Sequence, residues 1–168
     1  IMSTRSNCSK SNLRPAQVAS GGNSLAASEP LTFPHTPSAR QRQFLDLGCL
    51  EALYGGAAGG GKSEALRMAA LQYVNTPGYA ALILRKDTQR LQLAGGLIPR
   101  SQEWLADSGA VWNASRRQWT FSSGATLTFG YLSNGLDKYR YGSSEFQFIA
   151  FDELTEFVKT SGAQGLAF

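Results

Sequence analysis

The sequence has few of the residues that would bind a metal through cysteine and histidine, form disulfides or cross a membrane. Its 168 residues include only Cys8, Cys49 and His35 of those two types, and none has the spacing of a metal or redox site. We expect Cys49, in an apolar stretch, to be a buried and unreactive thiol of a reduced, intracellular protein. No apolar run is long enough to span a bilayer, and no signal-peptide core follows the N-terminus, so a membrane partner is not expected.

Charge is also sparse, and it is unevenly placed. Charged residues make up 17% of the chain, and the formal net charge is +4. All of this excess lies in residues 1–42, where one acidic residue, Glu29, accompanies five basic ones, Arg5, Lys10, Arg14, Arg40 and Arg42. The remaining residues carry equal numbers of basic and acidic side chains. Composition alone therefore does not predict a nucleic-acid-binding face.

The length suits one domain with its own core. Residues 1–30 are rich in Ser, Asn, Ala and Gly and have no helical or strand period, which predicts a disordered leader. Residues 31–168 are then the expected folded domain.

Glycine is plentiful, and it is concentrated in one stretch. From Gly56 the chain reads GAAGGGKS, which matches the phosphate-binding Walker A pattern G-x-x-x-x-G-K-[ST]. In that pattern the Lys62 ammonium binds the β- and γ-phosphates, and the Ser63 hydroxyl binds Mg²⁺. The backbone N–H groups that would surround the phosphates belong to the loop residues Gly56, Ala57, Ala58, Gly59, Gly60 and Gly61.

The flanks of this loop have the context that the pattern requires. Residues 51–54 are a short strand candidate, and residues 63–73 are rich in helix formers. The start of that helix would direct free N–H groups and a positive dipole end at a bound anion. A glycine-rich turn followed by Lys-Ser by chance is the alternative. A dinucleotide-type G-x-G-x-x-G from Gly59 fails because Glu64 stands where the last glycine would be.

The next elements alternate between helix and strand. Ser38 is a plausible N-cap for a short helix that ends near residue 47. Residues 79–84 (YAALIL) predict a strand that is buried on both faces, with Arg85 at its carboxyl end, where it could serve phosphates or DNA. Residues 88–105 predict two helices, with a break at the Gly95-Gly96 pair and at Pro99.

The period then changes to that of β-structure. Residues 112–129 contain short alternating aromatic and β-branched stretches with turn residues between them, which predicts an antiparallel meander inserted in a βαβ chain. Arg116 and Arg117, at one of these turns, could touch DNA, although a solvated turn is the simpler interpretation.

The last strand candidate ends in two acids. Residues 146–151 (FQFIAF) are followed by Asp152 and Glu153. An aspartate at the carboxyl end of such a Walker B strand holds Mg²⁺, directly or through water. The adjacent Glu153 can orient and deprotonate an attacking water. Two adjacent carboxylates favour hydrolysis over phosphoryl transfer to a metabolite.

With these residues the chain resembles the large terminase subunit of tailed bacteriophages, the ATPase that packs DNA into the capsid. The resemblance covers residues 36–157. The stretches that carry it are ARQRQFL, LYGGAAGGGKSEAL, GYAALILRK, RSQEWL, WTFSSGATLTFGYL and KYRYGSSEFQFIAFDELTEF. It implies an α/β P-loop NTPase fold of the additional-strand, RecA-like class, with a mostly parallel sheet flanked by helices and the meander inserted.

The resemblance also implies roles for particular residues. Gln41, in a segment similar to the family's adenine-recognition motif, would contact the base. Lys62 would bind phosphate, and Glu153 would be the catalytic base. Ser63 and Asp152 would hold Mg²⁺. Arg140 lies roughly where such motors carry an arginine finger that reaches a neighbour's site. A surface ion pair, for instance with Asp137, is the alternative for Arg140.

As a member of this family the chain would use ATP and Mg²⁺ and would work as a homo-oligomeric ring on double-stranded DNA. The portal protein of the prohead and the small terminase subunit would be its partners, in the host cytoplasm at the portal. The family's nuclease domain and the strand after the Asp-Glu strand have no counterpart here, so we expect an incomplete sheet, with its C-terminal part missing, and weak activity.

Three other functions fit the same motifs. A small-molecule kinase would use the phosphate loop to phosphorylate a metabolite. Another nucleic-acid ATPase would share the site without the packaging role. A non-hydrolysing remnant would bind nucleotide through residues 56–63 and stop there.

Overall fold

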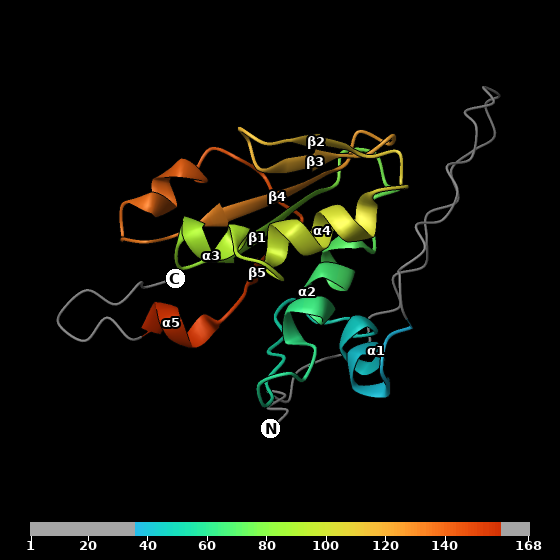
Figure 1. Cartoon of the computed structure of the whole chain (residues 1–168), viewed down its shortest axis with the longest axis vertical. Coiled ribbons are helices and arrows are strands. Elements are labelled where there is room, and N and C mark those ends of the chain that lie inside the picture. Colours follow the sequence, from blue (N-terminus) through green and yellow to red (C-terminus); the bar gives the residue numbers. More distant parts are fainter. Residues whose placement is uncertain (1–35, 159–168) are drawn as a thin grey trace.

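In the part of the chain that the structure describes, five strands form a single mixed sheet in the order β2-β3-β4-β1-β5 (Figure 1). The structure, a computed structural model, describes residues 36–158, so the predicted leader at residues 1–30 and His35 lie outside the described part. The strands are β1 (Ala80–Arg85), β2 (Val111–Asn113), β3 (Gln118–Thr120), β4 (Thr126–Tyr131) and β5 (Phe148–Phe151).

The sheet confirms an α/β fold but corrects the expected strand directions. β1 is parallel to both β4 and β5, whereas β2–β3 and β3–β4 are antiparallel pairs. The meander is therefore antiparallel, as predicted, but it is continuous with the sheet, because β4 is itself the parallel neighbour of β1. Short turns can only join antiparallel strands, and so the sheet is partly rather than mostly parallel.

Helices lie on both faces of this sheet. They are α1 (Ala39–Leu45), α2 (Lys62–Leu71), α3 (Thr88–Gln92), α4 (Leu97–Leu105), α5 (Leu154–Val158) and the 3₁₀ helix η1 (Asp137–Arg140). On the face opposite α2, α3 and α4, α5 contributes Phe157 to an apolar cluster. α2, α3 and α4 pack on the sheet, and α1 packs against α2 (Figure 1). The predicted break between α3 and α4 is present, whereas Pro99 lies inside the first turn of α4, where its missing N–H leaves no bond unmade.

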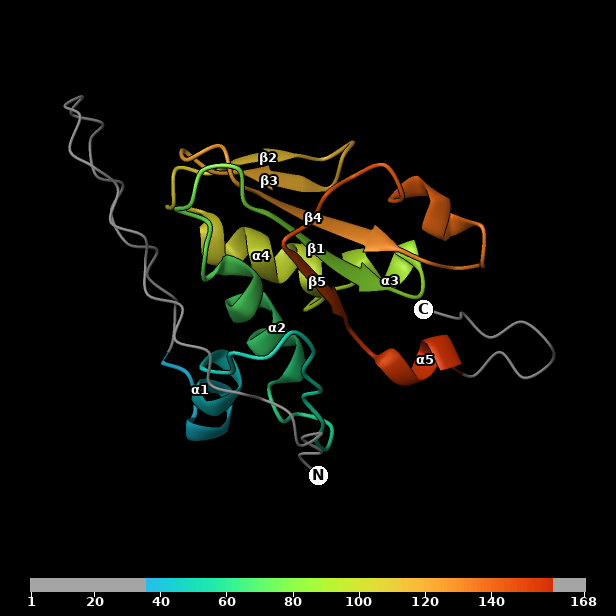
Figure 2. The same cartoon turned by 180° about the vertical axis from the view of Figure 1, so that it is seen from behind.

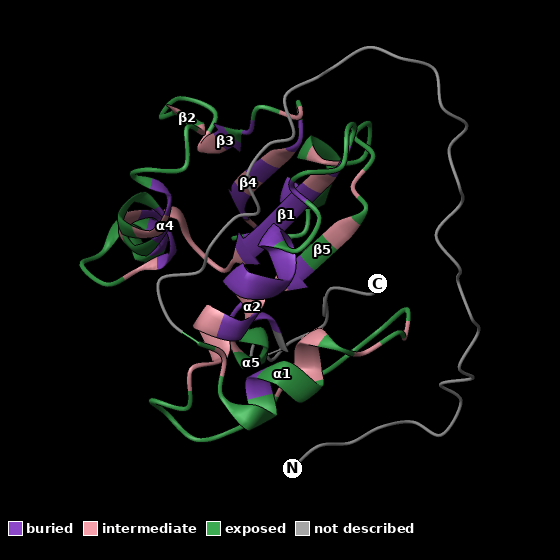
Figure 3. Cartoon of the chain, turned by 90° about the vertical axis from the view of Figure 1, so that its right-hand side faces the viewer, coloured by how far each residue is buried: buried purple, intermediate pink, exposed green. Residues whose placement is uncertain are grey.

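The core lies between β1 and the helical layer. Ala81 and Ile83 of β1 are fully buried against apolar residues of α2, α3 and α4. Their neighbours Leu82 and Leu84 point to the opposite face, because side chains alternate along a strand, and are also buried. β1 therefore has buried residues on both faces, as its continuous apolar run predicts, and Figure 3 shows the burial concentrated there and in α2.

The opposite face, seen in Figure 2, carries a smaller apolar cluster. Leu82, Leu84, Leu132 and Phe157 are its buried members. The Tyr141 hydroxyl accepts a hydrogen bond from the Tyr131 N–H at 3.0 Å, which ties the segment after β4 to the strand. A Cβ on Gly130 would lie 2.5 Å from the Tyr141 hydroxyl, so only glycine permits this contact.

The strand predicted at residues 51–54 is wrong. These residues form no strand, and Leu50 and Leu53 are exposed. In the part of the chain that the structure describes, β5 is the edge strand, and residues 51–54 do not pair with it. An extended segment without a neighbouring strand forms no inter-strand hydrogen bonds. Tyr54 packs instead against Phe44 of α1, with ring centroids 4.9 Å apart.

One expectation based on composition is corrected by the structure. Cys49 is a free thiol of intermediate exposure, so its predicted full burial is wrong. It lies in the irregular segment between α1 and the glycine-rich loop, which contributes little to the core. Among residues 36–158, no helix combines the length and apolar content needed to cross a bilayer.

Candidate functional site

The glycine-rich loop, residues 55–61, leads directly into α2. Gly61 is the N-cap residue with φ of 70°, and it has no side chain that could cap the first turn of the helix. The acceptor that an N-cap side chain usually supplies is therefore missing, and the N–H groups of that turn lie at the positive end of the helix dipole. The Lys62 ammonium donates to the carbonyls of Gly56 at 3.2 Å and Ala57 at 2.9 Å, which holds its charge beside the loop.

Gln41 fixes the end of this loop from α1. Its side chain completes a capping box with Ser38, as the predicted helix start implies. The Gln41 Nε2 group donates to the Gly61 carbonyl and to Glu64 Oε2, each at 3.1 Å. A Cβ on Gly61 would lie 2.6 Å from Gln41 Nε2. Both amide protons of Gln41 are therefore used within the chain, and its contact with an adenine base stays a prediction.

Asp152 is the point where three elements converge. It follows β5, is only 2% exposed and accepts a hydrogen bond from Ser63 Oγ, 2.9 Å from Oδ1 and 3.1 Å from Oδ2. Arg85, at the carboxyl end of β1, donates to Oδ2 from Nε at 2.9 Å and from Nη2 at 2.8 Å. Parallel neighbours end at the same edge of a sheet, so β1 and β5 bring Arg85 and Asp152 to the helix start.

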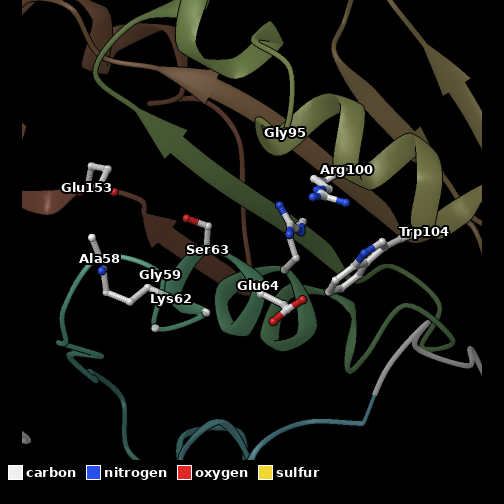
Figure 4. A pocket seen from close by; sticks show the side chains of 12 residues that line it. Ala58, Gly59, Lys62, Ser63, Glu64, Gly95, Arg100, Trp104 and Glu153 are labelled. Carbon is white, nitrogen blue, oxygen red and sulfur yellow. The ribbon is translucent and has the colours of Figure 1, made fainter.

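Glu153 occupies a strained position next to Asp152. Its φ of 56° lies in the left-handed region, which costs a residue with a side chain about 1 kcal/mol or more. This backbone conformation turns the chain between β5 and α5. The Glu153 side chain is exposed and borders the same cleft as the loop (Figure 4).

The cleft itself opens over the loop and the first turns of α2. Its volume of about 630 Å³ is in the range of small-molecule sites. The lining residues come from the loop, from α2, from the α3–α4 region and from the turn after β5 (Figure 4): Ala58, Gly59, Gly60, Gly61, Lys62, Ser63, Glu64, Arg67, Gly95, Arg100, Trp104 and Glu153.

Five of these lining residues were not expected from the sequence: Glu64, Arg67, Gly95, Arg100 and Trp104. Arg67 follows Ser63 by four residues on the same helix, so helical spacing could have placed both on one face. Arg100 and Trp104 have the same separation on α4, but no local pattern indicates that α4 packs beside α2. The basic residues Arg116 and Arg117 do not border this cleft, and neither does Arg140.

The oxygen ligands at Ser63 and Asp152 fit Mg²⁺ bound together with phosphate. Magnesium prefers oxygen, keeps several waters and commonly takes only one or two protein ligands beside the substrate phosphates. Within residues 36–158 no group of three or more His, Cys, Asp or Glu side chains could hold a metal ion. A metal ion at Ser63 and Asp152 would therefore need phosphate oxygens and waters as its other ligands. Asp152 Oδ1 contacts Ser63 and is not bonded to Arg85, so it is the oxygen best placed for such an ion.

Arg140 lies in η1, and its guanidinium has partners there. Its Nε is 3.2 Å from Asp137 Oδ1, and its Nη1 donates to the Tyr131 hydroxyl at 2.5 Å. The ion pair named as the alternative is therefore present. Arg140 is still 56% exposed, and its action as an arginine finger in a neighbouring subunit stays a prediction.

Asp137 makes this corner of the fold sensitive to acid. Its Oδ2 accepts from the Ser133 N–H and hydroxyl and from the Asn134 N–H, and these bonds hold the pKa of Asp137 below its ordinary value of 3.8. A carboxylate with a lowered pKa stabilises the fold fully above its unfolded pKa, and this stability is lost as pH falls through the folded value.

We therefore expect Asp137→Asn to lower the free energy of unfolding by about 1–3 kcal/mol at pH 7, because a neutral amide cannot replace a carboxylate oxygen that accepts three hydrogen bonds. The deficit should shrink as pH falls below about 3.8, because the carboxyl of the unfolded wild-type chain becomes protonated there and that of the folded chain at still lower pH. Urea unfolding of both proteins at pH 7 and pH 3 measures it. Asp107→Asn, at an exposed position, is the control, and an equal effect at both sites would contradict the assignment.

Comparison with protein families, with curated proteins and with solved structures gives no match to this chain.

Proposed function

We propose that the chain is a P-loop ATPase that hydrolyses ATP with Mg²⁺, and that it is the motor part of a phage DNA-packaging terminase. The observation that carries the ATPase proposal is the contact between Ser63 Oγ and Asp152 at the start of a helix without a side-chain cap. The motif GAAGGGKS and the acid pair after an apolar strand meet there, although they lie far apart in the sequence. The terminase assignment rests on the resemblance alone.

Each residue has a distinct task in this proposal. The loop N–H groups and the Lys62 ammonium bind the phosphates, because both present positive charge at the helix start. Ser63 and Asp152 hold the metal, which would neutralise phosphate charge during transfer. Glu153 takes a proton from the attacking water, for which its exposed side chain on the cleft wall is suitable.

One observation favours the non-hydrolysing alternative. Arg85 already neutralises Asp152, with two donors on a single carboxylate oxygen. A metal ion at Asp152 would lie close to that guanidinium and be repelled by it. If Arg85 does not move aside, the chain would bind nucleotide without hydrolysing it. The decisive measurement therefore has to separate nucleotide binding from turnover.

The first test compares wild type with Lys62→Ala. We expect wild type to bind ATP with Mg²⁺, and the variant to lose about 10- to 100-fold in affinity, the worth of one charge-assisted contact to phosphate. Calorimetric titration measures this change. Lys138→Ala, which removes an exposed lysine outside the cleft, should bind like wild type. Equal affinities of all three proteins would contradict the phosphate-loop assignment.

Phosphate release with and without linear double-stranded DNA separates the remaining possibilities. A packaging motor is expected to show DNA-stimulated release of inorganic phosphate, and no phosphorylated small molecule. An equal rate of phosphate release with and without DNA would count against the motor. A phosphorylated metabolite would indicate a kinase, and nucleotide binding without phosphate release would indicate the non-hydrolysing remnant.

A further inference from the structure

Arg67 is a buried cation beside the candidate phosphate site. It lies in the second turn of α2, three residues after Glu64 and four after Ser63, and therefore on the same face of the helix. The guanidinium of Arg67 lies over the Trp104 ring of α4, on the wall of the cleft that also contains the loop. Arg67 is only 6% exposed, and it nevertheless lines the cleft.

The hydrogen-bonding capacity of Arg67 is not satisfied. Its Nε is sealed from solvent and has no hydrogen-bond partner among residues 36–158. The guanidinium carbon lies 4.7 Å from the centre of the Trp104 ring, a cation–π contact that supports the group without using its N–H donors. A buried, unpaired donor on a charged group costs free energy, so such groups need an explanation. Burial lowers the pKa of Arg67, and nearby Glu64 and Asp152 oppose that shift.

A second cation stands on the same wall of the cleft. Arg100 of α4 is about half exposed and pairs with Glu103 of the same helix at 2.9 Å. An exposed pair of this kind contributes little and exchanges easily with another anion. The α2–α4 wall therefore offers one fixed positive charge, held by Trp104, and one that can reorient.

We propose that Arg67 recognises the terminal phosphate of the bound nucleotide, with Trp104 positioning its guanidinium and Arg100 adding long-range attraction. This rests on the proposed function, because it assumes a nucleotide in the loop. The loop and Lys62 accommodate a phosphate chain at the start of α2. Arg67 lies on the adjoining wall, where a third phosphate would supply an acceptor for its guanidinium, and Nε would be bonded once the side chain turns it toward the cleft. A diphosphate would leave that acceptor absent, so Arg67 would distinguish ATP from ADP.

The test compares two nucleotides on matched variants of the full chain. Calorimetric titrations would use a non-hydrolysable ATP analogue and ADP, each with Mg²⁺. Arg67→Met keeps the length of the side chain and its packing on Trp104 but removes the charge. We expect this variant to bind the ATP analogue about 10- to 100-fold more weakly than wild type. ADP binding should change by less than about 3-fold. Arg67→Lys keeps a point charge without the planar guanidinium, so its affinity for the ATP analogue should lie between those of wild type and Arg67→Met.

The outcomes separate this inference from the function on which it rests. If wild type binds both nucleotides and Arg67→Met affects them equally or not at all, Arg67 only joins α2 to α4 and the inference is overturned. If wild type binds neither nucleotide, the phosphate-loop function fails first and the inference falls with it. Circular dichroism checks that each variant is folded. Should Arg67→Met unfold, Arg67→Lys decides by the same selective loss for the analogue.

Wild-type tryptophan fluorescence gives a second measurement. Contact of the guanidinium with a terminal phosphate should change the emission of Trp104 when the ATP analogue binds, and much less when ADP binds. Trp104→Phe should abolish that difference, because Trp112 and Trp119 lie on strands β2 and β3 and do not line the cleft. An equal response to both nucleotides would contradict the inference.

Discussion

Glu153→Gln is expected to reduce ATP turnover by about 10²- to 10⁴-fold, the usual contribution of a positioned general base. Glutamine has the same shape and accepts hydrogen bonds, but it cannot take the proton of an attacking water. Binding of ATP with Mg²⁺ should remain within about 3-fold of wild type, because the loop, Lys62 and Ser63 are unchanged. Phosphate release in single turnover gives the rate, and calorimetric titration gives the affinity.

The control for this variant is Glu145→Gln, an exposed position before β5 that does not border the cleft. It should turn over ATP like wild type. If wild type, Glu153→Gln and Glu145→Gln share one slow rate, Glu153 is not the base. The chain would then be the nucleotide-binding remnant.

Arg85→Met is expected to lower the free energy of unfolding by about 3–5 kcal/mol, because it leaves the buried Asp152 carboxylate without its cation. Asp152 is 2% exposed, and Ser63 Oγ would be its remaining side-chain partner. Urea denaturation at pH 7 measures the loss. Arg100→Met removes the same group from an exposed pair and should cost less than about 1 kcal/mol.

The double variant Arg85→Met/Asp152→Asn tests the cause of that loss. With no lone charge left in the interior, it should recover much of the stability that Arg85→Met loses. A double variant as unstable as the sum of its parts would indicate that Arg85 acts through packing alone. The same pair also bears on function, since Arg85→Met should make Asp152 more available to Mg²⁺.

Local signals predicted the elements that position the site. Ser38 and the residues after it give the capped helix α1. Gly61 and Lys62 mark the start of α2, and the apolar run before Arg85 gives β1. In each case a cap, a glycine or a continuous apolar stretch acts within a few residues, so the sequence alone carries the information.

Contacts between distant segments were not predictable in the same way. Residues 51–54 have the composition of a strand, but a strand also needs a neighbour for its backbone, and none of the described residues supplies one. The pairing of Arg85 with Asp152 depends on β1 and β5 being adjacent, and the position of Arg67 depends on α4 packing beside α2. No pattern within either segment specifies these neighbours.

The left-handed backbone at Glu153 creates a conflict for anyone who wants a more heat-resistant form of this chain. A glycine there would relieve the steric cost of about 1 kcal/mol and would rank among the simplest thermostabilising substitutions. That substitution would also delete the carboxylate assigned to proton transfer. Melting temperature and turnover should therefore move in opposite directions at this one residue, as expected where a catalytic group occupies a conformation that suits glycine better.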